Sequence, residues 1–206
     1  MKENTILLKQ ARASLCGKWG LAIRTFVVYF LIMGTLNQIS QHFLWFFIPV
    51  FLITGPMTLG ASIFSLGVST NKEVSLELLF SGFQNSLNAI KVYALISLYT
   101  FLWFCLLIVP GIIALISYSQ VFYILAEDSN IGSMVAIDRS IEMMNGYKWK
   151  YFTLWVRMIG LALLCVLTLG IGFFWFFPYV NVVQAEFYLE LKSMPGGKEG
   201  DTVVLE

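Results

Sequence analysis

A long uncharged stretch in the middle of the chain decides its fold: Val92–Ala126 reads VYALISLYTFLWFCLLIVPGIIALISYSQVFYILA. None of these 35 residues is Asp, Glu, Lys or Arg. One straight helix of this length would extend for about 50 Å, whereas about 20 residues suffice to cross a hydrocarbon core of about 30 Å. Pro110 and Gly111 lie at its middle and are a strong turn signal. The stretch therefore predicts two membrane-spanning helices, 92–109 and 111–126, joined by a tight turn.

The composition of the whole chain agrees with a membrane protein. Of the 206 residues, 58% are hydrophobic and only 12% are charged, whereas a soluble domain carries about 25% charged residues. These values exclude a soluble globular domain and a disordered chain, and three cysteines are too few for a disulfide-rich module. A net charge of +1 offers no basic surface to a nucleic acid.

Further apolar segments complete an all-α, polytopic membrane protein with six transmembrane helices. Gly170 and Gly172 divide the last apolar block as Pro110 and Gly111 divide the central one. We expect a single transmembrane domain over residues 1–192 and a flexible cytoplasmic tail over 193–206. The four remaining spans are 19–36, 44–68 (kinked by Pro49 and Pro56), 151–169 and 172–191.

Basic residues collect on one side of this arrangement. The segment before the first span holds four Lys or Arg residues, and others follow the second, fourth and sixth spans. The connections after the first, third and fifth spans hold none. Because short cytoplasmic loops are rich in Lys and Arg, this pattern predicts that both termini are cytoplasmic.

Three segments on the predicted cytoplasmic side have the pattern of amphipathic helices. Each could lie on lipid, cover the inner end of the bundle or bind a partner protein. Their apolar stripes are Leu7, Leu8, Ala11 and Leu15 in the first, Leu76, Leu79, Phe80 and Phe83 in the second, and Met134, Ile137, Ile141 and Met144 in the third.

A weak internal repeat relates the two halves of the chain. A shift of 61 residues places Gly111 on Gly172 and Tyr118 on Tyr179, with Leu106 and Val121 also matched by identical residues. Both units then read as a polar helix, a span, a glycine turn and a returning span. Chance similarity and a parallel duplication of the kind found in transporters both remain open.

Three ionisable residues fall within the predicted spans near their cytoplasmic ends: Arg24, Arg157 and Glu186. Charged side chains are expensive in lipid, so such residues suggest a function. One interpretation is a layer that binds an anion or an anionic lipid headgroup. The other is that both arginines extend to the interface and that Glu186 pairs with one of them structurally.

Polar residues also mark one face of the fourth span and one face of the sixth. Ser117 and Gln120 lie on the fourth span, and Asn181, Gln184 and Tyr188 lie on the sixth at i, i+3 and i+7. Interhelical hydrogen bonds that hold the bundle together account for them, and a solute path would use similar residues.

Motifs of catalysis, phosphate binding or metal binding are missing from the sequence, so we expect no enzyme activity, no cofactor and no metal site. Two functional hypotheses follow. The first is a non-enzymatic membrane module that binds membrane lipids or a protein partner through its cytoplasmic helices and the layer of Arg24, Arg157 and Glu186. The second is a small transporter or export component, for which a homo-oligomer is a natural form.

An ordered series of short motifs resembles a known family. The motifs are LFSGF (79–83), IVPGI (108–112), AIDRS (136–140), GYKW (146–149), LTLGIG (167–172) and PY (178–179). Over about 55–192 the chain is similar to the bacterial integral membrane family catalogued as domain of unknown function nine-seven-five. It is more distantly similar to the membrane domain of glycerophosphodiester phosphodiesterases, whose catalytic domain it lacks. The resemblance implies a bacterial inner-membrane setting but no substrate and no site residues.

Overall fold

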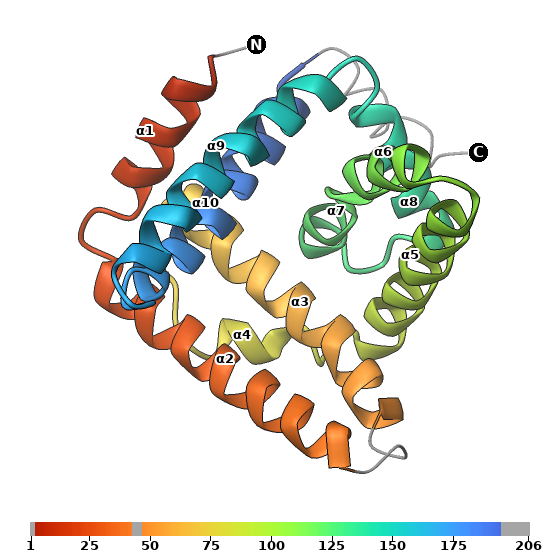
Figure 1. The fold of residues 1–206 in the computed structure, drawn as a ribbon, viewed down its shortest axis with the longest axis horizontal. Coiled ribbons are helices and arrows are strands. Elements are labelled where there is room, and N and C mark those ends of the chain that lie inside the picture. The colour runs from red at the N-terminus through yellow and green to blue at the C-terminus, as the bar shows by residue number, and fades with distance from the viewer. Residues whose placement is uncertain (1–2, 43–46, 195–206) are drawn as a thin grey trace.

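The fold is helical throughout the part of the chain that the computed structural model describes, residues 3–42 and 47–194 (Figure 1). Three short helices lie outside the long apolar segments, and one of these segments is divided into two shorter helices. In chain order they are α1 (Asn4–Ser14), α2 (Trp19–His42), α3 (Phe47–Ser69), α4 (Leu78–Ser81), α5 (Ser86–Leu106), α6 (Ile108–Tyr118), α7 (Val121–Glu127), α8 (Ser133–Met143), α9 (Lys148–Leu167) and α10 (Phe173–Lys192).

Five of the helical segments are long and apolar enough to cross a membrane: α2, α3, α5, α6 with α7, and α9. The sequence predicted a sixth span over 172–191. Helix α10 occupies this segment and is 20 residues long. Its second half is polar because it carries Asn181, Gln184, Glu186 and Glu190, and nine of its residues are buried against other helices. Since α10 is surrounded largely by protein, it does not need the uniform apolar surface of a lipid-facing helix.

The turn between α5 and α6 lies at Leu107 and not at Pro110–Gly111, where the sequence placed it. Leu107 has an extended backbone (φ −163°, ψ 146°), and α6 begins at the next residue. Pro110 therefore falls in the first turn of α6, where backbone N–H groups have no partner within the helix and proline costs nothing. Gly111 is needed because a Cβ there would lie 2.8 Å from the ring of Phe104.

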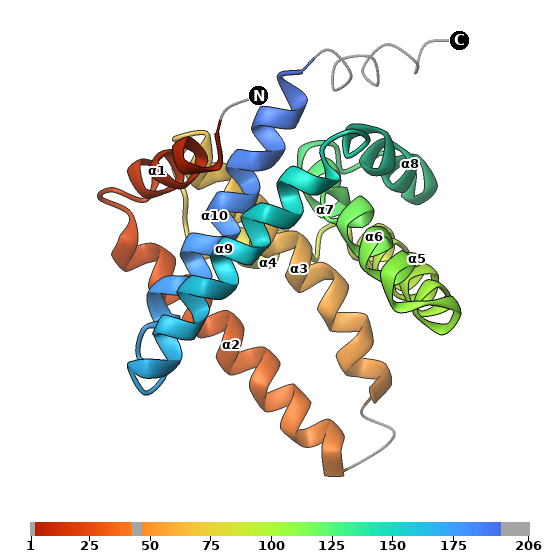
Figure 2. The same cartoon turned by 45° about the horizontal axis from the view of Figure 1, so that its top comes forward.

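The order of helices repeats three times along the described chain. Each unit consists of a short helix, an outgoing helix and a return helix. The outgoing helices are α2, α5 and α9, and the return helices are α3, α6–α7 and α10. In Figure 2, α1, α8 and the end of α10 lie at the top, whereas the α9–α10 turn and the end of α2 lie at the bottom. The three hairpins splay apart toward their turns.

Each short helix packs on the return helix of the preceding unit. Helix α4 lies on α3, α8 lies on α6 and α7, and α1 lies on α10, which joins the first unit to the last. The outgoing helices follow the same rule, because α5 contacts α3, α9 contacts α6 and α2 contacts α10. The result is a closed ring of three units, with the return helices at its centre.

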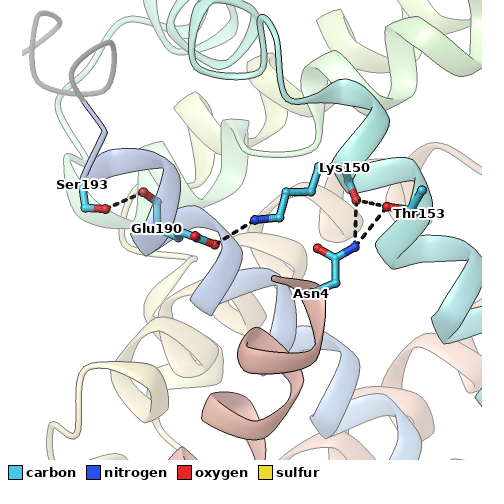
Figure 3. A network of polar contacts seen from close by, with 5 residues as sticks. All are labelled: Asn4, Lys150, Thr153, Glu190 and Ser193. Atoms are coloured by element: carbon cyan, nitrogen blue, oxygen red, sulfur yellow. Dashed lines mark hydrogen bonds and ion pairs between the residues drawn. The ribbon is translucent and has the colours of Figure 1, made fainter. Parts of the chain in front are cut away.

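Hydrogen bonds close this ring at the start of α1 (Figure 3). Asn4 Nδ2 donates to the Lys150 carbonyl oxygen at 3.3 Å and to Thr153 Oγ1 at 3.0 Å, both on α9. Lys150 Nζ lies 3.6 Å from Glu190 Oε2 on α10. Further along α1, Ser14 Oγ donates to Glu186 Oε1 at 2.7 Å. The N-terminal helix is thus fixed to both helices of the last unit.

Positions 61 residues apart share structural features as well as identical residues. Helix α5 ends at Leu106 and α9 ends at Leu167. A Cβ on Gly172 would lie 2.9 Å from Cys165 Sγ, as a Cβ on Gly111 would crowd Phe104, and each obstructing side chain lies seven residues earlier in the preceding helix. This shared geometry favours duplication over chance similarity.

The three predicted amphipathic stripes differ in how far the structure buries them. The stripe of α1 packs on the bundle, because Leu7, Ala11 and Leu15 are fully buried. In the second segment only Leu79 is buried, and the helix is a single turn. The stripe predicted for α8 is wrong in part, since Met134 and Ile141 are exposed. The buried face of α8 is Ala136, Ile137, Ser140 and Met143, continued by Met144, because α8 lies in the angle between α5, α6 and α7.

Candidate functional site

A cavity of about 300 Å³ lies between the return helices and α2, at the centre of the ring. It is near the lower end of the size range of small-molecule sites. Two kinds of residue line it. The aromatic ones are Phe26, Tyr29, Phe30, Phe122, Tyr123 and Phe177, and the small or polar ones are Thr58, Ala61, Ser62, Ser119, Asn181 and Gln184.

A second, apolar crevice of about 480 Å³ lies between α6, α9 and α10. Ser119 and Gln184 line both this crevice and the central cavity, so the two spaces are adjacent. Leu115 and Trp155 are exposed on the outer surface of the helices, which places the mouth of the crevice on the lateral face of the bundle. The rest of its lining is Ile112, Ile116, Tyr151 and Phe152.

The return helix of the second unit is interrupted where the two spaces meet. Helix α6 ends at Tyr118 and α7 begins at Val121. The Ser117 carbonyl, which a continuous helix would pair with the Val121 N–H, accepts instead from Ser140 Oγ on α8 at 2.7 Å. A side chain from another helix thus satisfies the backbone at the break, as membrane helices require.

The amide of Gln184 is the polar group at the junction of both spaces. In the described structure it makes no hydrogen bond within the protein, so its N–H₂ and its oxygen can both serve a ligand. Asn181 Nδ2 donates to the Phe177 carbonyl at 3.0 Å, and the Asn181 carbonyl accepts from Tyr123 OH at 3.1 Å. Asn181 is therefore held in place, and Gln184 is free to bind.

The other residues of the predicted polar face are structural. Ser117 is buried and donates to the Ile113 carbonyl at 2.8 Å. Gln120 is fully buried, and its Nε2 donates to Ser119 Oγ at 2.8 Å. Tyr188 OH donates to Glu127 Oε2 at 2.7 Å and its ring stacks on Tyr123. These contacts join α10 to α7 and support the residues that line the cavity.

The structure does not bring the three predicted ionisable residues together as ion pairs. Arg24 on α2 and Arg157 on α9 are both exposed. Glu186 is half-buried and accepts its hydrogen bond from Ser14. The ion pairs recorded among the described residues instead join Lys150 to Glu190 and Lys192 to Glu127.

Sequence reasoning missed Tyr29, Thr58, Ser62, Ser119 and Tyr123. Four of them carry a signal that was available, because the 61-residue shift applied once more toward the N-terminus places Thr58 on Ser119 and Ser62 on Tyr123. Tyr123 in turn falls on Gln184. Equivalent positions of the three return helices thus face one cavity. Tyr29 belongs to an outgoing helix and carries no such signal.

Fold and cavity together are compatible with a multi-pass membrane protein built from three helical hairpins around a small polar centre. Residues 104–194 match the model of a family described as a protein of unknown function (DUF975), and the chain is similar to that family over this segment. The match covers the return helix of the second unit, α6–α7, and the whole third unit, and it supports the resemblance seen in the sequence. Neither a curated protein nor a solved structure matches the chain, so the likeness to glycerophosphodiester phosphodiesterases has no support.

Proposed function

We propose that this protein is a non-enzymatic membrane protein that binds a lipid-like amphiphile between its helices. The apolar chain of the ligand lies in the crevice between α6 and α9, and its polar group enters the central cavity. The observation that carries the proposal is a pair of adjacent spaces, an apolar crevice and a cavity with more polar groups, that share Ser119 and the unpaired Gln184 amide.

The physical argument concerns which molecules can reach the site. A ligand that enters from the lateral face must pass through lipid, so it needs an apolar portion to match Leu115, Phe152 and Trp155. A polar group on the ligand that hydrogen-bonds to the Gln184 amide stabilises the complex, because an amide without hydrogen-bond partners in an apolar site costs free energy. Bulk lipid tails offer no such group at this depth.

The test uses an alkyl probe with a photoactivatable diazirine near its chain end, in nanodiscs of phosphatidylcholine. We expect saturable crosslinking to peptides that contain Leu115 or Trp155, because a defined crevice holds a limited number of ligands. Lipid-facing residues elsewhere, such as Leu163, should be labelled in proportion to probe concentration without saturation. Uniform, non-saturable labelling of all exposed helices would contradict the proposal.

Two matched variants locate the site. Ile116→Trp adds a large ring within the crevice lining and should abolish the saturable component. Ile159→Trp adds the same ring to an exposed position of α9 outside that lining and should leave it unchanged. The earlier hypothesis of a headgroup layer at Arg24 and Arg157 is tested alongside, since Arg24→Ala and Arg157→Ala should bind the probe like the unaltered protein.

The cellular setting is part of the proposal. We infer a bacterial inner-membrane protein with six spans, α10 being the sixth, and with α1, α4 and α8 on the cytoplasmic side, as the Lys and Arg distribution indicates. In a variant without the native cysteines, Ile171→Cys should react with an impermeant maleimide in intact cells. Asn145→Cys should react only after permeabilisation. Both positions are exposed, so the reverse result would overturn this orientation.

A second candidate is a small transporter, which the interruption between α6 and α7 favours. Discontinuous helices mark the binding sites of many transporters, and here the regular helix is interrupted at Ser119 and Gln120, which keep helical backbone angles, beside the central cavity. Uptake of a solute into proteoliposomes that Asn181→Leu abolishes would support transport. Saturable amphiphile binding without any solute flux would favour the binding module. A protein partner at the exposed Met134 and Val135 of α8 and a homo-oligomer remain compatible with either function.

A further inference from the structure

The central cavity has a continuous aromatic wall. The rings of Phe26 and Tyr29 have centroids 6.3 Å apart, those of Tyr29 and Phe30 are 5.5 Å apart, and those of Phe30 and Phe177 are 4.2 Å apart. Phe122 and Tyr123 add two more rings from the second unit. The faces of aromatic rings carry partial negative charge, and several rings around one site form the kind of cage that binds substituted ammonium groups.

The hydroxyl groups in the cavity offer acceptors and few donors. Thr58 Oγ1 donates to the Thr54 carbonyl at 2.8 Å and Ser62 Oγ donates to the Thr58 carbonyl at 3.0 Å. Ser119 Oγ donates to the Ile116 carbonyl at 2.8 Å, and Tyr123 OH donates to Asn181. The protons of these four hydroxyl groups are thus committed to backbone carbonyls, whereas lone pairs remain for a ligand, one on Ser119 being taken by Gln120 Nε2.

Charged side chains do not line the described cavity, and this selects among ligand groups. A phosphate or carboxylate would meet no cation in this lining, only the Gln184 N–H₂ group and the Tyr29 hydroxyl as donors, so it would recover little of its desolvation free energy. A small, strongly hydrated cation would lack a carboxylate partner. A substituted ammonium is weakly hydrated, so rings and lone pairs suffice to replace its water.

We infer that the central cavity selects a substituted ammonium group, so that the ligand is a cationic amphiphile with one alkyl chain in the crevice between α6 and α9. This inference rests on the proposed function and specifies its ligand. The Gln184 oxygen, at the junction of the two spaces, faces the positive end of the molecule from the side where the chain begins.

The test compares three competitors with the same twelve-carbon chain: dodecyltrimethylammonium, dodecanol and dodecanoate. Each displaces the diazirine probe from the protein in phosphatidylcholine nanodiscs, and concentrations are corrected for measured partitioning into the lipid. We expect dodecyltrimethylammonium to compete at an about ten-fold lower membrane concentration than the other two. Equal competition by dodecanol, or stronger competition by dodecanoate, would overturn the ammonium inference and leave the amphiphile site standing. Failure of all three to compete would contradict the proposed function itself.

Two substitutions separate the head of the ligand from its chain. Phe177→Leu removes a ring from the cage and should weaken dodecyltrimethylammonium several-fold without changing dodecanol. Phe152→Leu, in the crevice lining, should weaken all three competitors equally. Thr58→Val keeps the side-chain shape and removes one lining oxygen, and it provides an independent variant if Phe177→Leu does not fold. An equal loss for every competitor in both cavity variants would show that the cavity does not distinguish headgroups.

Discussion

The outgoing and return helices have similar lengths but opposite surroundings. In the most apolar window of each outgoing helix only 17% of residues are buried, compared with 56% in α3 and 44% in α6–α7. The glycines that allow close backbone contact, Gly55 and Gly60, and the polar residues of the cavity lie on return helices. The outgoing helices are mainly apolar and mostly exposed, which is compatible with contact to lipid.

This difference explains why the two sets tolerate different residues. A return helix packs on four or more neighbours, so small residues and internally bonded polar residues stabilise it. The outgoing helices α2 and α9 contact protein on a narrow side only, so their sequences need little beyond hydrophobicity. Substitutions of the same kind in the two sets should therefore have unequal effects.

The largest effect is expected from Gly60→Leu in α3. A Cβ at this position would overlap the Leu79 carbonyl of α4, and backbone atoms cannot move aside as a flexible side chain can. We expect a loss of about 3 kcal/mol or more in unfolding free energy, at the upper end of ordinary overpacking. Loss of helicity in a titration with dodecyl sulfate measures it.

Gly160→Leu in α9 is the matched control. A Cβ there meets nothing within 4 Å, and leucine has a better helix propensity than glycine. The control should leave stability unchanged or raise it slightly. Similar losses for both variants would mean that the return and outgoing helices do not differ as described.

A smaller loss is expected from Tyr188→Phe, which removes the hydrogen bond from α10 to Glu127 at the end of α7. Lys192 Nζ still lies 2.7 Å from Glu127 Oε2, so the carboxylate keeps a partner. We expect a cost of about 1 to 2 kcal/mol by thermal unfolding in detergent. Tyr118→Phe, which removes a hydroxyl without a hydrogen bond in the described structure, should cost less, and the reverse order would contradict the contact.

A double-mutant cycle between Lys150 and Glu190 should give a coupling energy of about 1 kcal/mol. Glu190 is nearly buried, with 4% of its side chain exposed, whereas 20% of the Lys150 side chain is exposed, so the ion pair is only partly screened by solvent. The single change Lys150→Met should cost more than the double change with Glu190→Gln, because it leaves a buried carboxylate without its cation. Additive effects in the cycle would show that the pair is not coupled.

The smallest effect is expected from the same cycle between Arg157 and Glu186. Arg157 is exposed on α9, and Glu186 is bonded to Ser14 on α1. We expect no measurable coupling, since no contact joins the two side chains in the described structure. A clear coupling energy would support the hypothesis that Arg24, Arg157 and Glu186 form a charged binding layer. It would count against the central cavity as the binding site.

Particular residues show which features of the fold and of the cavity could be predicted from the sequence. The apolar block Val92–Ala126 contains two opposed helices, as predicted, but the chain reverses three residues before Pro110 because proline fits the first turn of a helix. Asn181 and Gln184, which the sequence predicts to share a polar face, both line the central cavity. Thr58 and Ser62 were missed because a hydroxyl that bonds to its own helix looks unremarkable in any apolar span.

The sequence by itself determined that the chain is helical, that its helices suit a membrane and that the apolar block Val92–Ala126 contains two helices. The tertiary structure decided which helices lie at the centre, which face of α8 is buried and where the central cavity lies. The physical reason is that lipid is as apolar as a protein core, so hydrophobicity alone cannot tell a lipid-facing side from a packed one. Only the closed ring of three units assigns each helix its surroundings.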